Sequence, residues 1–308
     1  MTMRSASRFS AAALLCTLFL AGCDEKKALP DRTFATPEEG VTALIAAAEQ
    51  YNVTELKAIL GPDGDVLVSS GDTILDRNNA LAFAAQARTQ QRLEFDSTKT
   101  SATLLIGTED WPMPIPIVKD GSKWYFDAAA GADEVLRRRI GRNELDAIQA
   151  CQTYVLAQYE YALEKHDGAL VNQYAQRVIS TPGKHDGLGW FDADGTARGP
   201  IGEELARFIS EGYTERYDPF HGYYFKILKS QGPAGPLGEM DFVVEGAMIG
   251  GFGFVAAPAE YGVTGVQTFI VGSNGVIYQK DLGEKSVEAF RAMERYNPDS
   301  TWQVVQVP

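Results

Sequence analysis

The chain has 308 residues, of which 45% are apolar and 22% charged, and this ordinary globular composition excludes a collagen-like or wholly disordered chain. Its formal net charge of −13 argues against a protein that binds bare nucleic acid through a basic surface. The length fits about two domains of ordinary size, or one large one.

The first 22 residues have the pattern of a secretory signal peptide. Arg4 and Arg8 give a basic start, and residues 9–20 form an apolar run that is too short to span a bilayer. The run leads into Leu20-Ala21-Gly22-Cys23, which resembles the bacterial lipobox. That resemblance implies cleavage before Cys23 and acylation of its thiol and new amino group, for example with palmitate. The alternative is a plain signal peptide, or an uncleaved anchor, with an accidental cysteine.

Lipidation of Cys23 predicts a protein held on a membrane without a transmembrane helix. Its acyl chains exceed the two signals that stable anchoring needs, and no later stretch approaches about 18 consecutive apolar residues. Asp24 and Glu25 follow the cysteine, and an Asp at this position resembles the inner-membrane retention signal of enteric bacteria. We therefore expect a lipid-anchored protein on the periplasmic side of the bacterial cell envelope, with the inner membrane favoured over the outer.

Processing leaves one free thiol. Cys16 leaves with the signal peptide and Cys23 is acylated, so only Cys151 remains and an intramolecular disulfide is impossible. No histidine lies near Cys151 in sequence, and it falls on the apolar face of a predicted helix. We therefore expect a buried structural cysteine rather than a nucleophile.

After a tether over residues 23–32, residues 33–135 are predicted to form an N-terminal α+β unit. A helix begins after Thr36, because Thr36 suits the N-cap, Pro37 the first turn and Glu39 the third position. Two more helices are predicted at residues 53–60 and 76–90. Short strands follow near residues 93–95, 103–106, 115–118 and 123–126, with a hairpin turn at 119–122.

Residues 136–308 are predicted to form a second α+β unit built on one long helix. No glycine or proline occurs from Arg142 to Glu164, which predicts an amphipathic helix of about 20 residues. Its predicted apolar face consists of Leu145, Ile148, Cys151, Val155, Tyr159 and Ala162. Strands are then predicted at residues 223–228, 241–245, 253–257, 268–271 and 276–279. A helix followed by antiparallel strands predicts a sheet packed on that helix.

Several separate sequence blocks match one known family in order. They are Trp111–Pro116, Trp124–Asp127, Arg138–Glu144, Ser180–Lys184, His221–Phe225, Pro258–Val266 and Tyr278–Gly283. On these blocks, nearly all of residues 33–305 resembles the uncharacterised bacterial family called domain of unknown function twenty-nine-fifty. The family brings no established activity, so the resemblance implies no catalytic residue.

The second unit also resembles pilin-like and pseudopilin-like modules, which pack one long helix on an antiparallel sheet. The residues that carry this resemblance are Asn143-Glu144, Ala147-Ile148, Ala157-Gln158, Tyr161, Gly222–Phe225, Gly265–Phe269 and Asn274–Ile277. The chain lacks the processing site and the apolar N-terminal helix half of true pilins, so a filament subunit is not expected. The first unit is similar to cone-shaped domains of the nuclear-transport-factor-two-like kind.

Five residues of the second unit are candidates for a ligand groove: His185, Trp190, His221, Glu260 and Tyr261. Histidine and carboxylate in one cleft can perform acid–base catalysis. The alternative for His221 is a hydrogen-bonded residue at a strand end. A wider aromatic set either lines a groove for glycan or peptide or fills the core: Trp111, Trp124, Trp190, Tyr223, Tyr224, Phe252 and Tyr261.

We expect no metal and no cofactor. The three histidines lack zinc-ligand spacing, and no His-Glu-x-x-His, Cys-x-x-Cys or Gly-x-Ser-x-Gly motif occurs. Asp192, Asp194 and Glu203 faintly resemble a calcium loop, but Ala197 stands where that loop needs glycine. An acidic surface turn is the expected structure there.

A group of arginines stands out in so acidic a chain: Arg137, Arg138, Arg139 and Arg142. They could face anionic lipid headgroups. The favoured alternative is pairing with acids where the two units join, such as Asp133, Glu134 and Glu144.

The sequence thus favours a non-catalytic, membrane-anchored envelope lipoprotein that binds a periplasmic partner or supports assembly. One alternative is a periplasmic hydrolase or cell-wall-binding enzyme that uses His185, His221 and Glu260. Another is a calcium-dependent binding module around Asp192.

Overall fold

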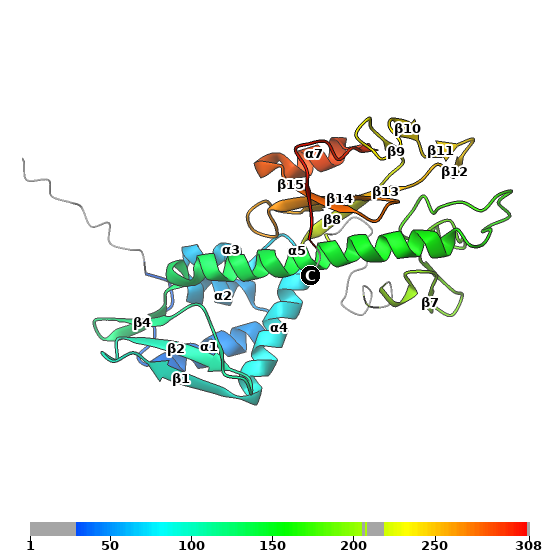
Figure 1. Cartoon of the computed structure of the whole chain (residues 1–308). Coiled ribbons are helices and arrows are strands. Elements are labelled where there is room, and N and C mark those ends of the chain that lie inside the picture. The colour runs from blue at the N-terminus through cyan, green and yellow to red at the C-terminus, as the bar shows by residue number, and fades with distance from the viewer. Residues whose placement is uncertain (1–28, 205–206, 208–218, 307–308) are drawn as a thin grey trace, which may run out of the picture.

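The computed structural model describes residues 29–204, 207 and 219–306, and its fold is α+β, as predicted (Figure 1). The predicted signal peptide and Cys23 lie outside the described residues. One helix, α5 (Ala128–Tyr161), runs through the molecule over 34 residues. Helices and a small sheet lie along its first half, and a second sheet lies along its other half (Figure 1).

The N-terminal unit packs short helices against a small antiparallel sheet. Its helices are α1 (Pro37–Glu49), α2 (Val53–Leu60), η1 (Pro62–Gly64), α3 (Asp65–Val68) and α4 (Thr73–Thr89). Its strands are β1 (Gln91–Phe95), β2 (Ser101–Ile106), β3 (Trp111–Pro112), β4 (Ile117–Asp120) and β5 (Lys123–Phe126). The order is β1-β2-β4-β5, and β3 pairs with β2. Ile45, Ile59, Leu104 and Ile117 are among the fully buried residues between these layers.

Local capping explains where these helices begin. Thr36 Oγ1 accepts a hydrogen bond from Glu39 N, so α1 starts as predicted. The bounds of α2 also match the prediction. Helix α4 begins at Thr73, three residues before the predicted start, because Asp72 Oδ1 accepts from Leu75 N at 2.9 Å and caps the helix.

The C-terminal unit is an antiparallel sheet held between α5 and a short helix, α7 (Ser286–Ala292) (Figure 1). The sheet order is β17-β15-β14-β13-β8, so β8 (Tyr223–Leu228) is an edge strand. The other strands of this sheet are β13 (Gly253–Pro258), β14 (Gln267–Gly272), β15 (Ile277–Asp281) and β17 (Gln303–Val304). The smaller elements are β6 (Trp190–Phe191), β7 (Ala197–Arg198), β9 (Ser230–Gln231), β10 (Met240–Asp241), β11 (Val243–Val244), β12 (Ala247–Met248), η2 (Gly283–Lys285) and β16 (Arg295–Tyr296).

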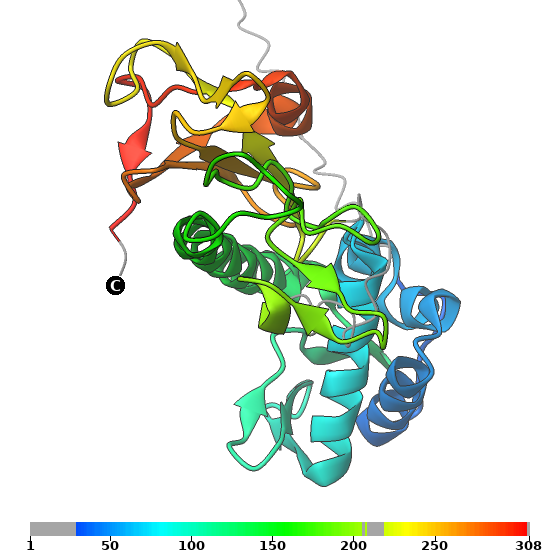
Figure 2. The same cartoon turned by 90° about the vertical axis from the view of Figure 1, so that its right-hand side faces the viewer.

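The pleat of β8 places alternate side chains on opposite faces of the sheet. Tyr223, Phe225 and Ile227 belong to the core between the sheet and α5, as predicted. Lys226 points to the other face, where its Nζ donates to Phe290 O at 2.6 Å. The β6–β7 hairpin lies on the side of α5 away from this sheet (Figures 1 and 2).

The predicted start of the long helix, near Arg142, is wrong. Helix α5 begins at Ala128, where the Asp127 side chain caps it, and so the predicted unit boundary at residues 135 and 136 falls inside one continuous helix. Gly131 in its first turns is needed for packing, because a Cβ there would lie 2.8 Å from Ile115 Cα. Gly131 therefore permits the close contact of α5 with the N-terminal unit.

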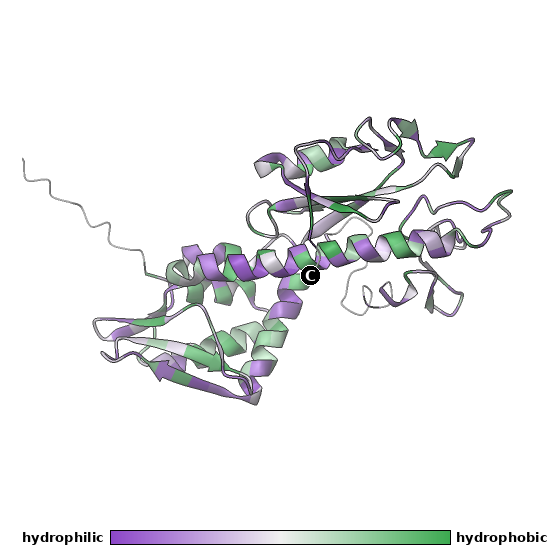
Figure 3. Cartoon of the chain, viewed as in Figure 1, coloured by the Kyte–Doolittle hydropathy of each residue, from purple (hydrophilic) through white to green (hydrophobic). Residues whose placement is uncertain are grey.

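The predicted apolar face of this helix is correct in part, since Ile148 and Val155 pack against the core. Leu145 is 59% exposed and Tyr159 is 45% exposed, whereas Cys151 is buried as expected. The face that packs on the sheet carries small and polar residues, namely Asn143, Ala147, Cys151, Tyr154, Ala157, Gln158 and Tyr161. Figure 3 accordingly shows hydrophilic and hydrophobic colours mixed along α5.

Buried hydrogen bonds explain why polar residues occupy that face. Asn143 Nδ2 donates to Thr264 O at 2.9 Å. Gln158 donates to Ala175 O and accepts from Ala175 N, both at 2.8 Å. These bonds pair Gln158 and the Nδ2 group of Asn143, whose burial would otherwise be costly. Among the described helices, none is long and apolar enough to cross a membrane.

A tight turn of the second unit contacts the first unit. His221 and Gly222 both have positive φ angles, 49° and 76°, and Phe220 and Tyr223 exchange backbone hydrogen bonds across them. This is the geometry of a two-residue hairpin turn. Gly222 N donates to Asp72 Oδ2 at 3.0 Å, so the carboxylate that caps α4 also holds the turn of the second unit.

Candidate functional site

A cavity of about 730 Å³ lies between α5, the segment 176–204 and strand β8, and we call it the β8 cavity. Aromatic and aliphatic side chains form much of its wall, including Tyr154, Ile179, Leu188, Ile201, Phe225 and Phe254. Charged residues of both signs also line it, namely Asp146, Arg177, Glu203, Glu204, Arg207 and Lys226. A mostly apolar cavity of this size with a few polar groups is typical of a binding site.

The open edge of β8 faces this cavity. Tyr223 exchanges its hydrogen bonds with Phe220 on the outer side of the strand, so the N–H and C=O groups of Phe225 and Ile227 point to that same side. Farther along the strand, Lys229 O accepts from Phe242 N. In the part of the chain that the structure describes, no group bonds the outward backbone of Phe225 or Ile227. The edge of β8 between the bonds of Tyr223 and the bond of Lys229 can therefore pair with another strand.

A histidine–carboxylate pair stands in the cavity wall. His221 Nδ1 lies 2.7 Å from Asp146 Oδ2, and both residues line the cavity. The ring of His221 stacks on Phe220 at 4.1 Å between centroids. A carboxylate that orients an imidazole is one element of an acid–base site. Within the described lining, Thr153 is the only aliphatic hydroxyl and no serine or cysteine is found.

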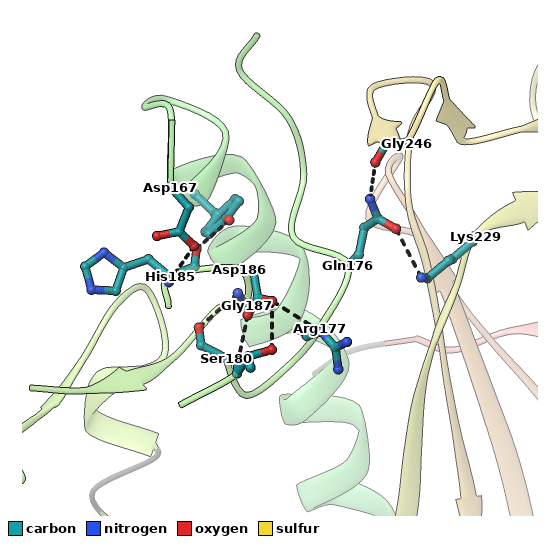
Figure 4. A network of polar contacts seen from close by, with 11 residues as sticks. Asp167, Gln176, Arg177, Ser180, His185, Asp186, Gly187, Lys229 and Gly246 are labelled. Carbon is teal, nitrogen blue, oxygen red and sulfur yellow. Dashed lines mark hydrogen bonds and ion pairs between the residues drawn. The ribbon is translucent and has the colours of Figure 1, made fainter. Parts of the chain in front are cut away.

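Polar contacts fix the wall opposite β8 (Figure 4). Gln176 Nε2 donates to Gly246 O at 2.7 Å, and Lys229 Nζ donates to Gln176 Oε1. Asp186 accepts from Thr181 N and Oγ1, at 2.7 and 2.8 Å. The bonds of Gln176 hold the start of this cavity-lining segment against the strands of the second unit, and those of Asp186 close the loop that follows it.

Two of the predicted groove residues lie elsewhere. The ring of His185 lies 4.4 Å from that of Trp190, and in Figure 4 this imidazole points away from the polar network. His185 N donates to Asp167 Oδ2, and Tyr161 OH donates to His185 O. Neither His185 nor Trp190 is among the described residues that line the β8 cavity.

Two other predicted groove residues follow β13. Glu260 is not in the described lining of the β8 cavity, and its backbone N donates to Thr264 Oγ1 at 2.9 Å, which closes the loop after the strand. Tyr261 OH donates to Asp281 Oδ2 at 3.1 Å. Of the five residues, the structure thus places His221 alone in the described lining of the cavity.

The acidic turn and the aromatic set occupy different kinds of position. Asp192 pairs with Arg198 at 3.0 Å, and Asp194 accepts from Thr196 N, as an acidic surface turn requires. No group of three or more metal-ligating side chains is found within residues 29–204 and 219–306. Of the aromatic set, Tyr223 and Phe252 are fully buried, whereas Tyr224 lines the β8 cavity.

Cys151 is a buried, free cysteine on the inner face of α5, as predicted. Burial raises the pKa of its thiol to about 12. The thiolate is therefore scarce at neutral pH, and a structural role fits better than nucleophilic chemistry.

The sequence did not indicate that Asp146 is the partner of His221, nor that β8 is an edge strand. Asp146 lies 75 residues away in sequence, on a helix whose buried face the hydrophobic pattern does not reveal. The one available signal was the turn His221-Gly222, since glycine at the second position of a two-residue turn indicates a hairpin. Whether a strand lies at a sheet edge depends on the order of the strands in space.

The chain belongs to the family described as "Protein of unknown function (DUF2950)", whose model matches residues 31–305, and the resemblance found in the sequence blocks is confirmed. No curated protein and no solved structure matches the chain. The likeness to pilin-like modules and to cone-shaped domains stays a prediction.

Proposed function

We propose that this protein is an acylated lipoprotein on the periplasmic side of the cell envelope, anchored through Cys23. The support is the order of a basic start, an apolar run and Leu20-Ala21-Gly22-Cys23. The lipid bilayer is then its first partner, and Asp24-Glu25 favours the inner membrane.

The anchored domain is a non-catalytic binding protein whose β8 cavity receives an extended segment of an envelope protein. The observation that carries this is the open edge of β8 beside an apolar, aromatic wall. An added strand would bond the outward backbone groups of Phe225 and Ile227, and its alternate side chains would enter the cavity.

Charge fits a polypeptide better than a uniformly charged ligand. Asp146, Glu203 and Glu204 line the same cavity as Arg177, Arg207 and Lys226. Both signs can be matched by one peptide with side chains of mixed charge, because charge complementarity sets register and specificity.

Metabolic labelling with radioactive palmitate tests the anchoring. The Cys23→Ala variant loses the thiol that carries the lipid, so it should remain unlabelled and leave the membrane fraction. Equal label on the wild type and the variant would contradict lipidation at this residue.

Peptide selection tests the binding site. The unlipidated mature protein, with Cys23→Ser, is screened against a random peptide library, and bound peptides should slow amide hydrogen exchange at Phe225 and Ile227. Ile227→Pro removes an outward N–H, while the ladder to β13 keeps its bonds at Lys226 and Leu228. This variant should fold and should no longer bind the selected peptides. Peptides that bind it as tightly as the wild type would contradict strand addition.

A periplasmic hydrolase is a second candidate, and the 2.7 Å contact between His221 and Asp146 favours it. In that case His221→Gln would abolish turnover of peptide or cell-wall fragments. The binding function predicts that His221→Gln leaves the affinity for selected peptides within about threefold, because no strand bond involves the imidazole.

A further inference from the structure

A second cavity, of about 770 Å³, lies in the N-terminal unit where α4, α5 and the small sheet meet. We call it the α4–α5 cavity. Its floor is apolar and includes Leu44, Leu60, Phe83, Ile106, Met113 and Val135. Several of these residues belong to the core of the unit. The floor therefore offers a hydrophobic surface continuous with the protein interior.

Three arginines of α5 line one side of this cavity: Arg138, Arg139 and Arg142. Arg139 is buried and donates to Val66 O and Leu67 O, both at 2.7 Å. Its guanidinium therefore satisfies two backbone carbonyl groups of α3. Arg142 is exposed, and within the described residues its guanidinium makes no hydrogen bond or ion pair. The expected pairing with acids holds for Arg138 through Glu134 and fails for Arg142. Arg139 makes no ion pair among the described residues, but it lies close enough to Asp76 and Glu260 to interact with both electrostatically.

Arg138 is held at the rim in a defined position. Its guanidinium lies 4.9 Å from the ring centroid of Trp111, which also lines the cavity. Arg138 Nε also donates to Glu134 Oε1 at 2.7 Å. Since the planar guanidinium keeps other N–H groups, it can still bind a second anion.

The acids in the lining offset only part of this positive rim, because Asp76 acts on Arg139 while Arg142 makes no ion pair within the described residues. Asp76 accepts from Ser70 N and Ser70 Oγ, both at 2.7 Å, so both of its carboxylate oxygens are already hydrogen-bonded within the N-terminal unit. Glu109 is the other acidic residue in the described lining. A cluster of three arginines over an apolar floor is unusual in a chain of net charge −13.

We propose that the α4–α5 cavity binds a single-chain anionic amphiphile, with its carboxylate or phosphate between Arg138 and Arg142 and its alkyl chain over the floor. Arginine matches both headgroups through paired N–H donors. The volume lies within the range of cavities that enclose small ligands. This site is separate from the β8 cavity and shares no described lining residue with it.

Fluorescence quenching of Trp111 tests the proposal. The probe is dodecanoate with a bromine on the carbon next to its carboxylate, added below its micelle concentration to the unlipidated mature protein. Saturable quenching should appear, and Trp111→Phe should remove most of it, because no other tryptophan is found in the described lining of this cavity.

Matched arginine variants identify the headgroup site. Arg142→Gln should weaken binding about tenfold, as expected for one lost charge-assisted contact. Arg137→Gln is the control, because Arg137 lies on the same helix, pairs with Glu134 and does not line the cavity. Both variants alter exposed side chains and should unfold at the wild-type urea concentration.

Chain and headgroup series complete the test. Binding should tighten about fourfold for each added methylene, and dodecanol should bind at least tenfold more weakly than dodecanoate. Dodecyl phosphate is compared with dodecanoate, and the tighter of the two identifies a phosphate or a carboxylate as the natural headgroup. Equal affinities of Arg142→Gln and Arg137→Gln, or equal binding of dodecanol and dodecanoate, would overturn the proposal.

Discussion

Substitution of Gly222 by alanine should destabilise the protein strongly, because this residue lies at the junction of the two units. Its φ angle is 76°, a left-handed conformation in which an alanine costs about 1–2 kcal/mol. A Cβ there would lie 2.6 Å from Asn143 Nδ2 and 2.9 Å from Thr264 Cβ. Both distances are shorter than a van der Waals contact, so Asn143 and Thr264 must move to make room for the methyl group.

The movement would break a buried hydrogen bond. Asn143 Nδ2 donates to Thr264 O at 2.9 Å, and leaving such groups unpaired costs about 1–3 kcal/mol. Together with the backbone cost, Gly222→Ala should lower the free energy of unfolding by about 2–5 kcal/mol. Urea denaturation followed by circular dichroism measures this directly.

Gly262 provides the matched control. Its φ angle is 74°, and among the described residues none beyond its two chain neighbours has an atom within 4 Å of the position that a Cβ would take there. Gly262→Ala should therefore show the backbone cost alone, about 1–2 kcal/mol. If the two variants lose equal stability, the packing of the turn against Asn143 and Thr264 does not matter and the reasoning is refuted.

Two further outcomes follow from the second unit. Burial raises the pKa of Cys151 to about 12, so Ellman's reagent should label the native Cys23→Ser protein slowly and the denatured protein at once; rapid stoichiometric labelling of the native state would contradict the burial. Tyr223→Ala should cost about 3–5 kcal/mol, since the ring is fully buried and its OH donates to Gln267 O, whereas the exposed Asp281→Ala should cost little. Equal urea midpoints for those two variants would contradict the strand register.

Local signals in the sequence predicted several short elements correctly, although the strand predicted at residues 241–245 is two short strands in different sheets, β10 and β11, and α7 was not predicted. Thr36 and Pro37 marked the start of α1, and Gly61 marked the end of α2. Alternation from Tyr223 to Ile227 indicated the correct faces of β8. In each case the determining interaction lies within a few residues along the chain or follows from the period of the strand.

The long helix and the site could not be predicted in the same way. The buried face of α5 carries Ala147, Asn143 and Gln158 because close packing and backbone partners elsewhere satisfy it. Hydrophobic periodicity instead selected Leu145, which is exposed. The open edge of β8 depends on strand order, and the pairing of His221 with Asp146 depends on how α5 lies on the sheet.

Photocrosslinking in intact cells tests the central claim, that the β8 cavity receives a segment of an envelope protein. Benzoylphenylalanine is placed at Thr153, which lines the cavity, and at Gln152, its exposed neighbour on α5, which does not. We predict an adduct from Thr153 that maps to one short segment of an envelope protein and disappears in Ile227→Pro. The same adducts from both positions, or none from Thr153, would contradict the account.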